Sequence, residues 1–253
     1  MEKDPELPVV PAKWGLPYAE DEMKPAVKRE QTYIVAFAVL TILAWQTQIG
    51  TLALMPFTLL STWWHEMAHG LTAALLGAEF HRLVIFANGS GYAESSGNLW
   101  AVEQAIVSAA GLLGPTIAGC AMIIASRSRR ATRIALLGLA AALVVSTLIW
   151  VRSLTGWIVL PAFALAAFYI ATRASAKWQR ISVEFLGVQG AVSVYQDFGY
   201  LFSPGGVMGG QMVRSDTGKI ADALLLPYWF WGGAITVAIV AMVWKSLRVA
   251  GRY

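Results

Sequence analysis

Long runs of apolar residues, separated by short polar gaps, are the dominant pattern of this chain. The hydrocarbon core of a bilayer is about 30 Å thick, and an α-helix of roughly 20 apolar residues crosses it. Runs of about that length lie approximately at residues 33–52, 56–78, 102–125, 134–151, 156–173, 182–202 and 228–247. The pattern therefore predicts an all-α polytopic membrane protein with six or seven transmembrane helices.

Two of the polar gaps carry patterns of their own. In residues 80–98, apolar side chains lead into an Asn-Gly-Ser-Gly turn, which predicts a short surface β-hairpin after the second span. Residues 203–211 contain a proline and four glycines, which predicts irregular backbone. Ser215 and Asp216 follow with side chains that cap helices, so a short helix is expected to begin there.

The first 29 residues differ from the rest of the chain. They mix five prolines with acidic and basic residues, a composition that breaks helices and buries little apolar surface. We expect an extended N-terminal tail over residues 1–29 and a transmembrane domain over residues 30–253. Because no cleavable signal peptide is visible, the first apolar run is expected to direct insertion, and the compact chain favours a bacterial inner (cytoplasmic) membrane.

Composition and charge agree with a membrane location. Of the 253 residues, 57% are hydrophobic and 13% are charged, which leaves little for a soluble domain. The net charge of +4 is spread over the gaps between apolar runs, so we predict that the basic residues meet the lipid bilayer and not nucleic acid. In a seven-span arrangement these residues fall nearly equally on the two sides, so the orientation stays open. The lone Cys120 cannot form an internal disulfide.

The second predicted span carries the sequence His65-Glu66-Met67-Ala68-His69. Histidines at positions i and i+4 project from one helix face about 5–6 Å apart at Cβ, a spacing that suits one zinc ion. Zinc lowers the pKa of a bound water to about 7, and Glu66 is close enough to take the proton of that water as it attacks a carbonyl. Because burying two imidazoles and a carboxylate in lipid is costly, a metal site is favoured over polar residues that merely face water or a neighbouring helix.

A catalytic zinc site needs a third protein ligand and an open position for water. Two carboxylates late in the chain are candidates. Asp216 follows the glycine-rich segment, which can deliver it along a cavity into the membrane, although a helix cap alone would also explain it. Asp197 lies near the end of the sixth predicted span, where a polar residue facing headgroups is the more ordinary interpretation. We therefore prefer Asp216 to Asp197 as the third ligand.

Together these residues resemble the site-2 protease family of intramembrane zinc metalloproteases, most of all its compact branch without a PDZ domain. The resemblance covers nearly all of the chain after the tail. It rests on the two histidines and the glutamate in an early span, the hairpin, a Gly-Pro pair in the next span and a late aspartate. In that family the histidines and aspartate bind zinc and the glutamate activates water. The resemblance implies zinc as cofactor, His65, His69 and Asp216 as its ligands, and Glu66 as the catalytic residue.

Two motifs depart from the family pattern. The family aspartate is usually followed by glycine, whereas Asp216 is followed by Thr217 and then Gly218. The Gly-Pro motif of the family often carries a later asparagine, whereas Pro115 is followed by Thr116 and two apolar residues. Contacts that position the substrate are therefore not carried over from the family.

Three classes of function fit the sequence. The leading one is an endopeptidase that admits a transmembrane or juxtamembrane segment of a membrane-protein substrate, unwinds it and hydrolyses a peptide bond; segments 80–98 and 203–211 are candidates for gating the site or pairing with the substrate. A non-catalytic subunit or scaffold in a membrane-protein complex would keep a structural or vestigial metal site, with a closed coordination shell. A small transporter would need carboxylates along a path through the bilayer.

Overall fold

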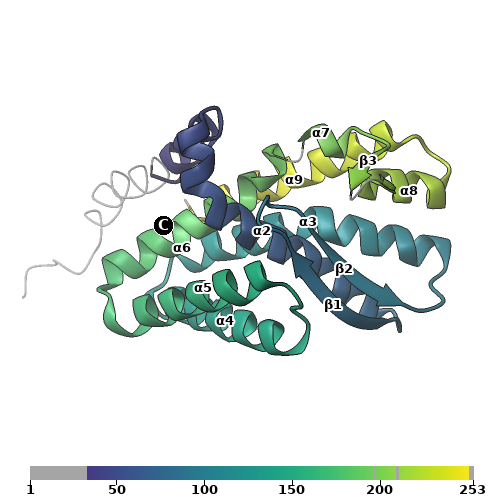
Figure 1. Ribbon diagram of the computed structural model, residues 1–253. Helices are drawn as coiled ribbons and strands as arrows, with labels where there is room; N and C mark the ends of the chain where they lie inside the picture. The colour runs from purple at the N-terminus through teal and green to yellow at the C-terminus, as the bar shows by residue number, and fades with distance from the viewer. Residues whose placement is uncertain (1–32, 197, 209–210, 251–253) are drawn as a thin grey trace, which may run out of the picture.

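The computed structural model describes residues 33–196, 198–208 and 211–250, and it consists mainly of packed α-helices (Figure 1). Four of the described helices are long and apolar enough to cross a membrane: α3 (Ala101–Ala125), α4 (Arg129–Ile149), α5 (Leu154–Arg173) and α9 (Tyr228–Ala250). A fifth crossing is added if the bent pair formed by the helix Tyr33–Trp45 and α2 (Gln48–Leu75) counts as one span. The structure confirms a helical membrane fold, but the predicted six or seven spans are not confirmed.

The bent pair replaces the first two predicted spans. The apolar pattern placed a break at residues 53–55, but the helix breaks at Gln46–Thr47 and turns by 118°. Thr47 caps α2 by accepting a hydrogen bond from the backbone N–H of Gly50. Gly50 also allows the two helices to touch, since a Cβ there would lie 2.1 Å from the carbonyl oxygen of Ala44. A cap and a close contact set this break, and neither changes the hydrophobic pattern.

The sixth predicted span, 182–202, is also divided. It is covered by α6 (Ala176–Val192), the 3₁₀ turn η1 (Ser193–Tyr195) and the short helix α7 (Phe198–Leu201). Helix α6 has 17 residues and packs against α3 and α4, where it buries polar side chains. One of them, Gln189, donates a 2.7 Å hydrogen bond to Thr41 Oγ1 and so ties α6 to the helix Tyr33–Trp45.

Two antiparallel hairpins lie outside the helical bundle. The first, β1 (Glu79–Ile85) with β2 (Gly91–Ser96), confirms the hairpin predicted for residues 80–98. The second, β3 (Gly205–Met208) with β4 (Gln211–Arg214), lies where irregular backbone was predicted. Glycines carry little strand propensity, so this pairing could not be predicted from the residue pattern. Helix α8 (Asp216–Leu224) follows β4, as the capping residues predicted.

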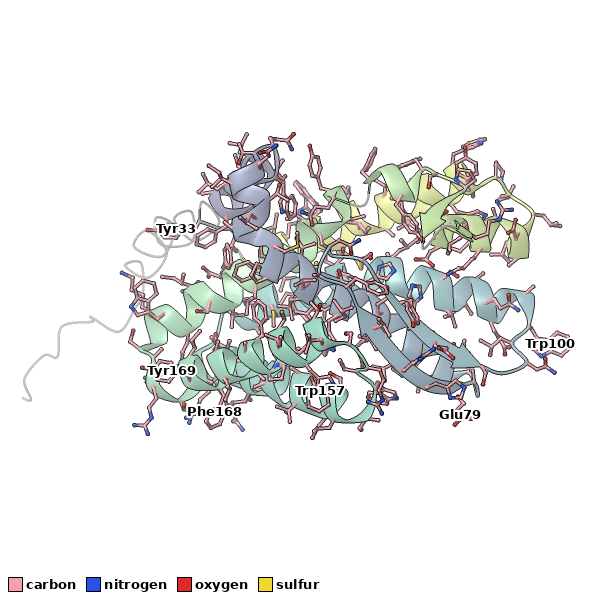
Figure 2. All side chains as sticks on the ribbon, in the orientation of Figure 1. Tyr33, Glu79, Trp100, Trp157, Phe168 and Tyr169 are labelled. Atoms are coloured by element: carbon pink, nitrogen blue, oxygen red, sulfur yellow. The ribbon has the colours of Figure 1, made fainter. Side chains whose placement is uncertain are left out.

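The core and the outer surface of the bundle are both apolar. One buried cluster joins α2, β1, α4, α5 and α6, and another joins α3, α8 and α9. On α5 the aromatic side chains of Trp157, Phe168 and Tyr169 point outward (Figure 2), and they are 47%, 54% and 66% exposed. Such a surface suits lipid contact. The predicted tail, residues 1–29, and the domain boundary at residue 30 lie outside the described residues.

Candidate metal centre

Three side chains from distant parts of the chain converge at the middle of the bundle. His65 and His69 project from one face of α2, and Asp216 is the first residue of α8. The Nε2 atoms of the two histidines are 2.9 Å apart, and Asp216 Oδ2 lies 3.1 Å from His65 Nε2 and 3.3 Å from His69 Nε2. These are the three residues predicted as ligands. Asp197, the other candidate, lies outside the described residues.

The donor atoms fit a small tetrahedral metal ion. One ligand atom of each residue lies within 4.8 Å of the other two. Zinc binds imidazole nitrogen and carboxylate oxygen at about 2.0–2.2 Å, which places neighbouring tetrahedral ligands about 3.3 Å from each other. Two nitrogens and one oxygen at nearly this separation form the donor set of a three-ligand site with a position left for water. The role of these residues as metal ligands stays a prediction.

Helix α3 orients the His69 ring. The Nδ1 atom of His69 lies 2.8 Å from the carbonyl oxygen of Val107, which can only accept, so Nδ1–H is the donor. Nε2 is then left to face the other ligand atoms, as in metal sites where a second contact fixes the histidine tautomer. Gly111, one turn further along α3, makes room for the ring, because a Cβ there would lie 2.1 Å from His69 Nε2.

Hydroxyl groups hold the start of α8 in place. Ser215 caps the helix by accepting from the Gly218 backbone N–H at 3.0 Å, and it donates to the carbonyl oxygen of Ser203. Thr217 donates a 3.0 Å hydrogen bond to the carbonyl oxygen of Leu201. The Ser-Asp-Thr-Gly sequence, which departs from the family pattern, thus anchors Asp216 through the side chains on either side of it.

The Asp216 carboxylate is 2% exposed and is fully engaged. Its Oδ2 faces the histidines, and its Oδ1 accepts a 3.1 Å contact from Lys219 Nζ, one turn further along α8. Burial raises the pKa of this carboxyl, whereas His69 and His65 lower it, and the balance holds the pKa well below its usual range.

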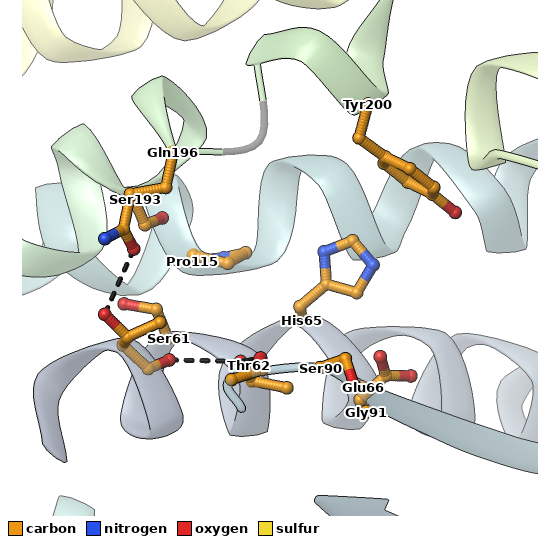
Figure 3. Close-up of a pocket in the computed structure, with 12 residues that line it drawn as sticks. Ser61, Thr62, His65, Glu66, Ser90, Gly91, Pro115, Ser193, Gln196 and Tyr200 are labelled. Carbon is orange, nitrogen blue, oxygen red and sulfur yellow. Dashed lines mark hydrogen bonds between the residues drawn. The ribbon is translucent and has the colours of Figure 1, made fainter. Parts of the chain in front are cut away.

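Glu66 lies where two cavities meet. One cavity, of about 250 Å³, extends along α2 towards Gln196, and the other, of about 360 Å³, extends along β2 towards Asp216. His65, Glu66, Gly91 and Tyr200 line both. Figure 3 shows the Glu66 carboxylate beside Gly91 with Tyr200 above the His65 ring. The buried carboxylate thus borders a passage that reaches the candidate ligands from two sides.

Strand β2 forms one wall of this passage. Its partner β1 is fixed on its other edge, since Leu83 N–H donates to the Trp150 carbonyl at 2.8 Å and Arg152 N–H donates to the Leu83 carbonyl at 2.9 Å. The start of β2 lies against α2, because a Cβ on Gly91 would lie 2.8 Å from Thr62 Cγ2 and 3.2 Å from Glu66 Cγ. Residues of β2, which pairs with β1 alone in its described sheet, line the cavity beside the site.

Sequence reasoning missed several residues around the site. Lys219 sits three residues after Asp216, a spacing that brings side chains together on a helix, so this contact could have been found. Gly111 lies within the apolar run of α3, and its specific fit to His69 has no sequence signal. Tyr200 comes from a four-residue helix beyond α6, and only the fold brings it over His65.

Comparison with known proteins agrees with this geometry. Residues 33–246 match the Peptidase M50B-like family, whose members are in general zinc-dependent. No curated protein and no solved structure matches the chain. The family match covers most of the chain, and the apolar helices and the family together point to a multi-pass membrane protein. The chain belongs to the Peptidase M50B-like family, which is the site-2 protease family.

Proposed function

We propose that this protein is an intramembrane zinc metalloendopeptidase that hydrolyses peptide bonds in or near transmembrane segments of membrane-protein substrates. The observation that carries the proposal is the convergence of His65, His69 and Asp216 beside Glu66, at the junction of two cavities. Because both cavities reach His65, a position beside the ligands is open to water and substrate. That opening favours hydrolysis over a structural metal site, which has a closed coordination shell.

The residues divide the chemistry between them. His65, His69 and Asp216 would hold zinc, which when bound supplies an activated water and polarises the substrate carbonyl. Glu66 takes the proton of the attacking water and delivers it to the leaving amine as the peptide bond breaks. The hydrogen bond from His69 to Val107 and the caps around Asp216 keep the ligands in place, so little reorganisation is needed during the reaction.

The passage suits an extended segment better than a helix. A helix hides its carbonyls in internal hydrogen bonds, so the substrate must unwind before hydrolysis. The outer edge of β2 offers backbone partners to such a segment. Hydroxyl groups of Thr58, Ser61, Thr62 and Ser193 line the cavity on the other side of the site. We place the enzyme in a bacterial inner membrane, alone or in a membrane-protein complex.

The test is cleavage of a transmembrane substrate in proteoliposomes by wild type, Glu66→Gln and Glu79→Gln. Glu79 is an exposed carboxylate of β1 and provides the matched control. Loss of a general base costs on the order of 10² to 10⁴ in rate. We expect Glu66→Gln to lose that much while keeping its zinc, and Glu79→Gln to match wild type. Cleavage by Glu66→Gln at the wild-type rate would sink the proposal.

A further inference from the structure

A third and larger cavity shares no residue with the metal site. Its volume is about 840 Å³, and its walls come from the start of the helix Tyr33–Trp45, the α3–α4 connection and the start of α6. Its described lining carries four basic side chains, Arg127, Arg129, Lys177 and Arg180, and one acidic side chain, Glu184. Nothing in the proposed proteolysis uses this cavity.

The cavity lies at one end of the helical bundle. Helices α3 and α6 run antiparallel, since Gly187 faces Ile123 whereas Gly190, one turn later, faces Pro115. The end of α3 therefore lies beside the start of α6. Figure 2 shows Tyr33 and Tyr169 on this side and Trp100 and Glu79 on the opposite side. Nine of the described basic residues lie at this end: Arg127, Arg129, Arg130, Arg133, Arg173, Lys177, Arg180, Lys245 and Arg248. Such a basic end belongs at the headgroup level of a membrane.

The polar wall is built for an anion. Arg180 Nε donates a 2.8 Å bond to the buried Glu184 carboxylate, which fixes the arginine in the wall. The hydroxyl groups of Ser126 and Thr132 donate to backbone carbonyls of α3, so both donors are already used within the protein. Among the described lining residues, basic side chains outnumber acidic ones by four to one, and the first residues of α4 and α6 also line the cavity. Arginine and lysine beside helix N-termini suit a phosphate.

The remaining wall is apolar. Tyr33, Phe37 and Ile181 line it, and the Phe37 ring packs edge-on against Phe185 with centroids 5.7 Å apart. A free phosphate has no apolar surface to bury against this wall, whereas the glycerol and first methylenes of a lipid would bury apolar surface on it. We propose that the cavity binds an anionic phospholipid, with its phosphate on the arginine and lysine side chains and its acyl chains leaving along Phe37 and Ile181.

The test compares lipid binding by the full chain in detergent, measured by native mass spectrometry with phosphatidylglycerol and phosphatidylcholine of identical acyl chains. The lining variant is Arg129→Gln with Lys177→Gln. The matched control is Arg130→Gln with Arg173→Gln, two exposed basic residues of the same end that do not line the cavity. Each basic residue near the surface contributes roughly fivefold in affinity for anionic lipid. We expect wild type and the control to prefer phosphatidylglycerol about tenfold or more, and the lining variant to lose most of that preference.

Four results would overturn this assignment. Equal binding of the two lipids by wild type would show that the cavity does not select charge. An equal loss of the preference for phosphatidylglycerol in the lining and control variants would mean that a diffuse basic surface binds the lipid. Displacement of the bound lipid by soluble glycerol phosphate at the same concentration would mean that the cavity binds a soluble anion. A preference that emerges only after deletion of residues 1–29 would make the N-terminal tail the occupant. None of these results depends on protease activity.

Discussion

The α2–α3 and α4–α5 helix pairs are both closely packed, but they bury different chemistry. Between α2 and α3, glycines bring the backbones together: Gly111 faces His69, and Gly114 faces Ala68 and the Trp64 carbonyl. Between α4 and α5 the contact is made by leucine and alanine side chains, and Thr147 donates to the backbone of its own helix. The α2–α3 pair positions the candidate metal ligands, and the α4–α5 pair provides apolar side chains against which α2 packs.

The largest effect that separates the two pairs is expected from Gly111→Ala. A methyl group there would collide with His69 Nε2. Loss of such support around a metal ligand typically lowers metal affinity by about 10- to 100-fold. Gly138→Ala in α4 is the control, since nothing lies within 4 Å of the added Cβ. Zinc titration should show the loss only for Gly111→Ala. The free energy of unfolding of Gly138→Ala should be higher than that of wild type by about 0.5–1 kcal/mol, because alanine favours the helix more than glycine does. Equal zinc affinity in both variants would remove the special role of the α2–α3 contact.

A smaller effect is expected from Ser215→Ala, which removes the cap that anchors Asp216. Loss of a serine cap costs about 1 kcal/mol, or roughly fivefold in an equilibrium constant. The control is Ser175→Ala at the start of α6, where the serine side chain makes no capping bond. We expect zinc affinity to fall for Ser215→Ala and to stay unchanged for Ser175→Ala. If both variants bind zinc as wild type does, Asp216 is held by something other than its cap.

The smallest effect is expected from Lys219→Ala. The Lys219 side chain is 49% exposed, so its contact with Asp216 is screened by solvent and is worth less than about 1 kcal/mol. Zinc affinity should change by no more than about fivefold, and it should change less at high salt. Lys245→Ala, an exposed lysine of α9, is the comparison. A loss as large as that of Gly111→Ala would mean that Lys219 has a direct role at the site.

The sequence predicted the helical membrane class, the first hairpin and the residues that the fold brings together, because each has a local signature: apolar length, a turn, ligand spacing. It did not predict the 118° corner at Gln46–Thr47, since a cap and a close glycine contact leave no hydrophobic signal. The β3–β4 hairpin was missed because its glycines resemble a loop. The fit of Gly111 to His69 depends on how two helices pack, which no single segment encodes.

The central claim is that His65, His69 and Asp216 bind one zinc ion. The most direct test is the zinc content of the detergent-purified protein, measured for wild type, His65→Ala, Asp216→Ala and His81→Ala. His81 lies in the first hairpin and serves as the control. We expect about one zinc per chain in wild type and His81→Ala, as a mononuclear site requires, and almost none in the other two variants. A wild-type protein without metal under zinc-replete conditions, or full zinc content in Asp216→Ala, would contradict the claim.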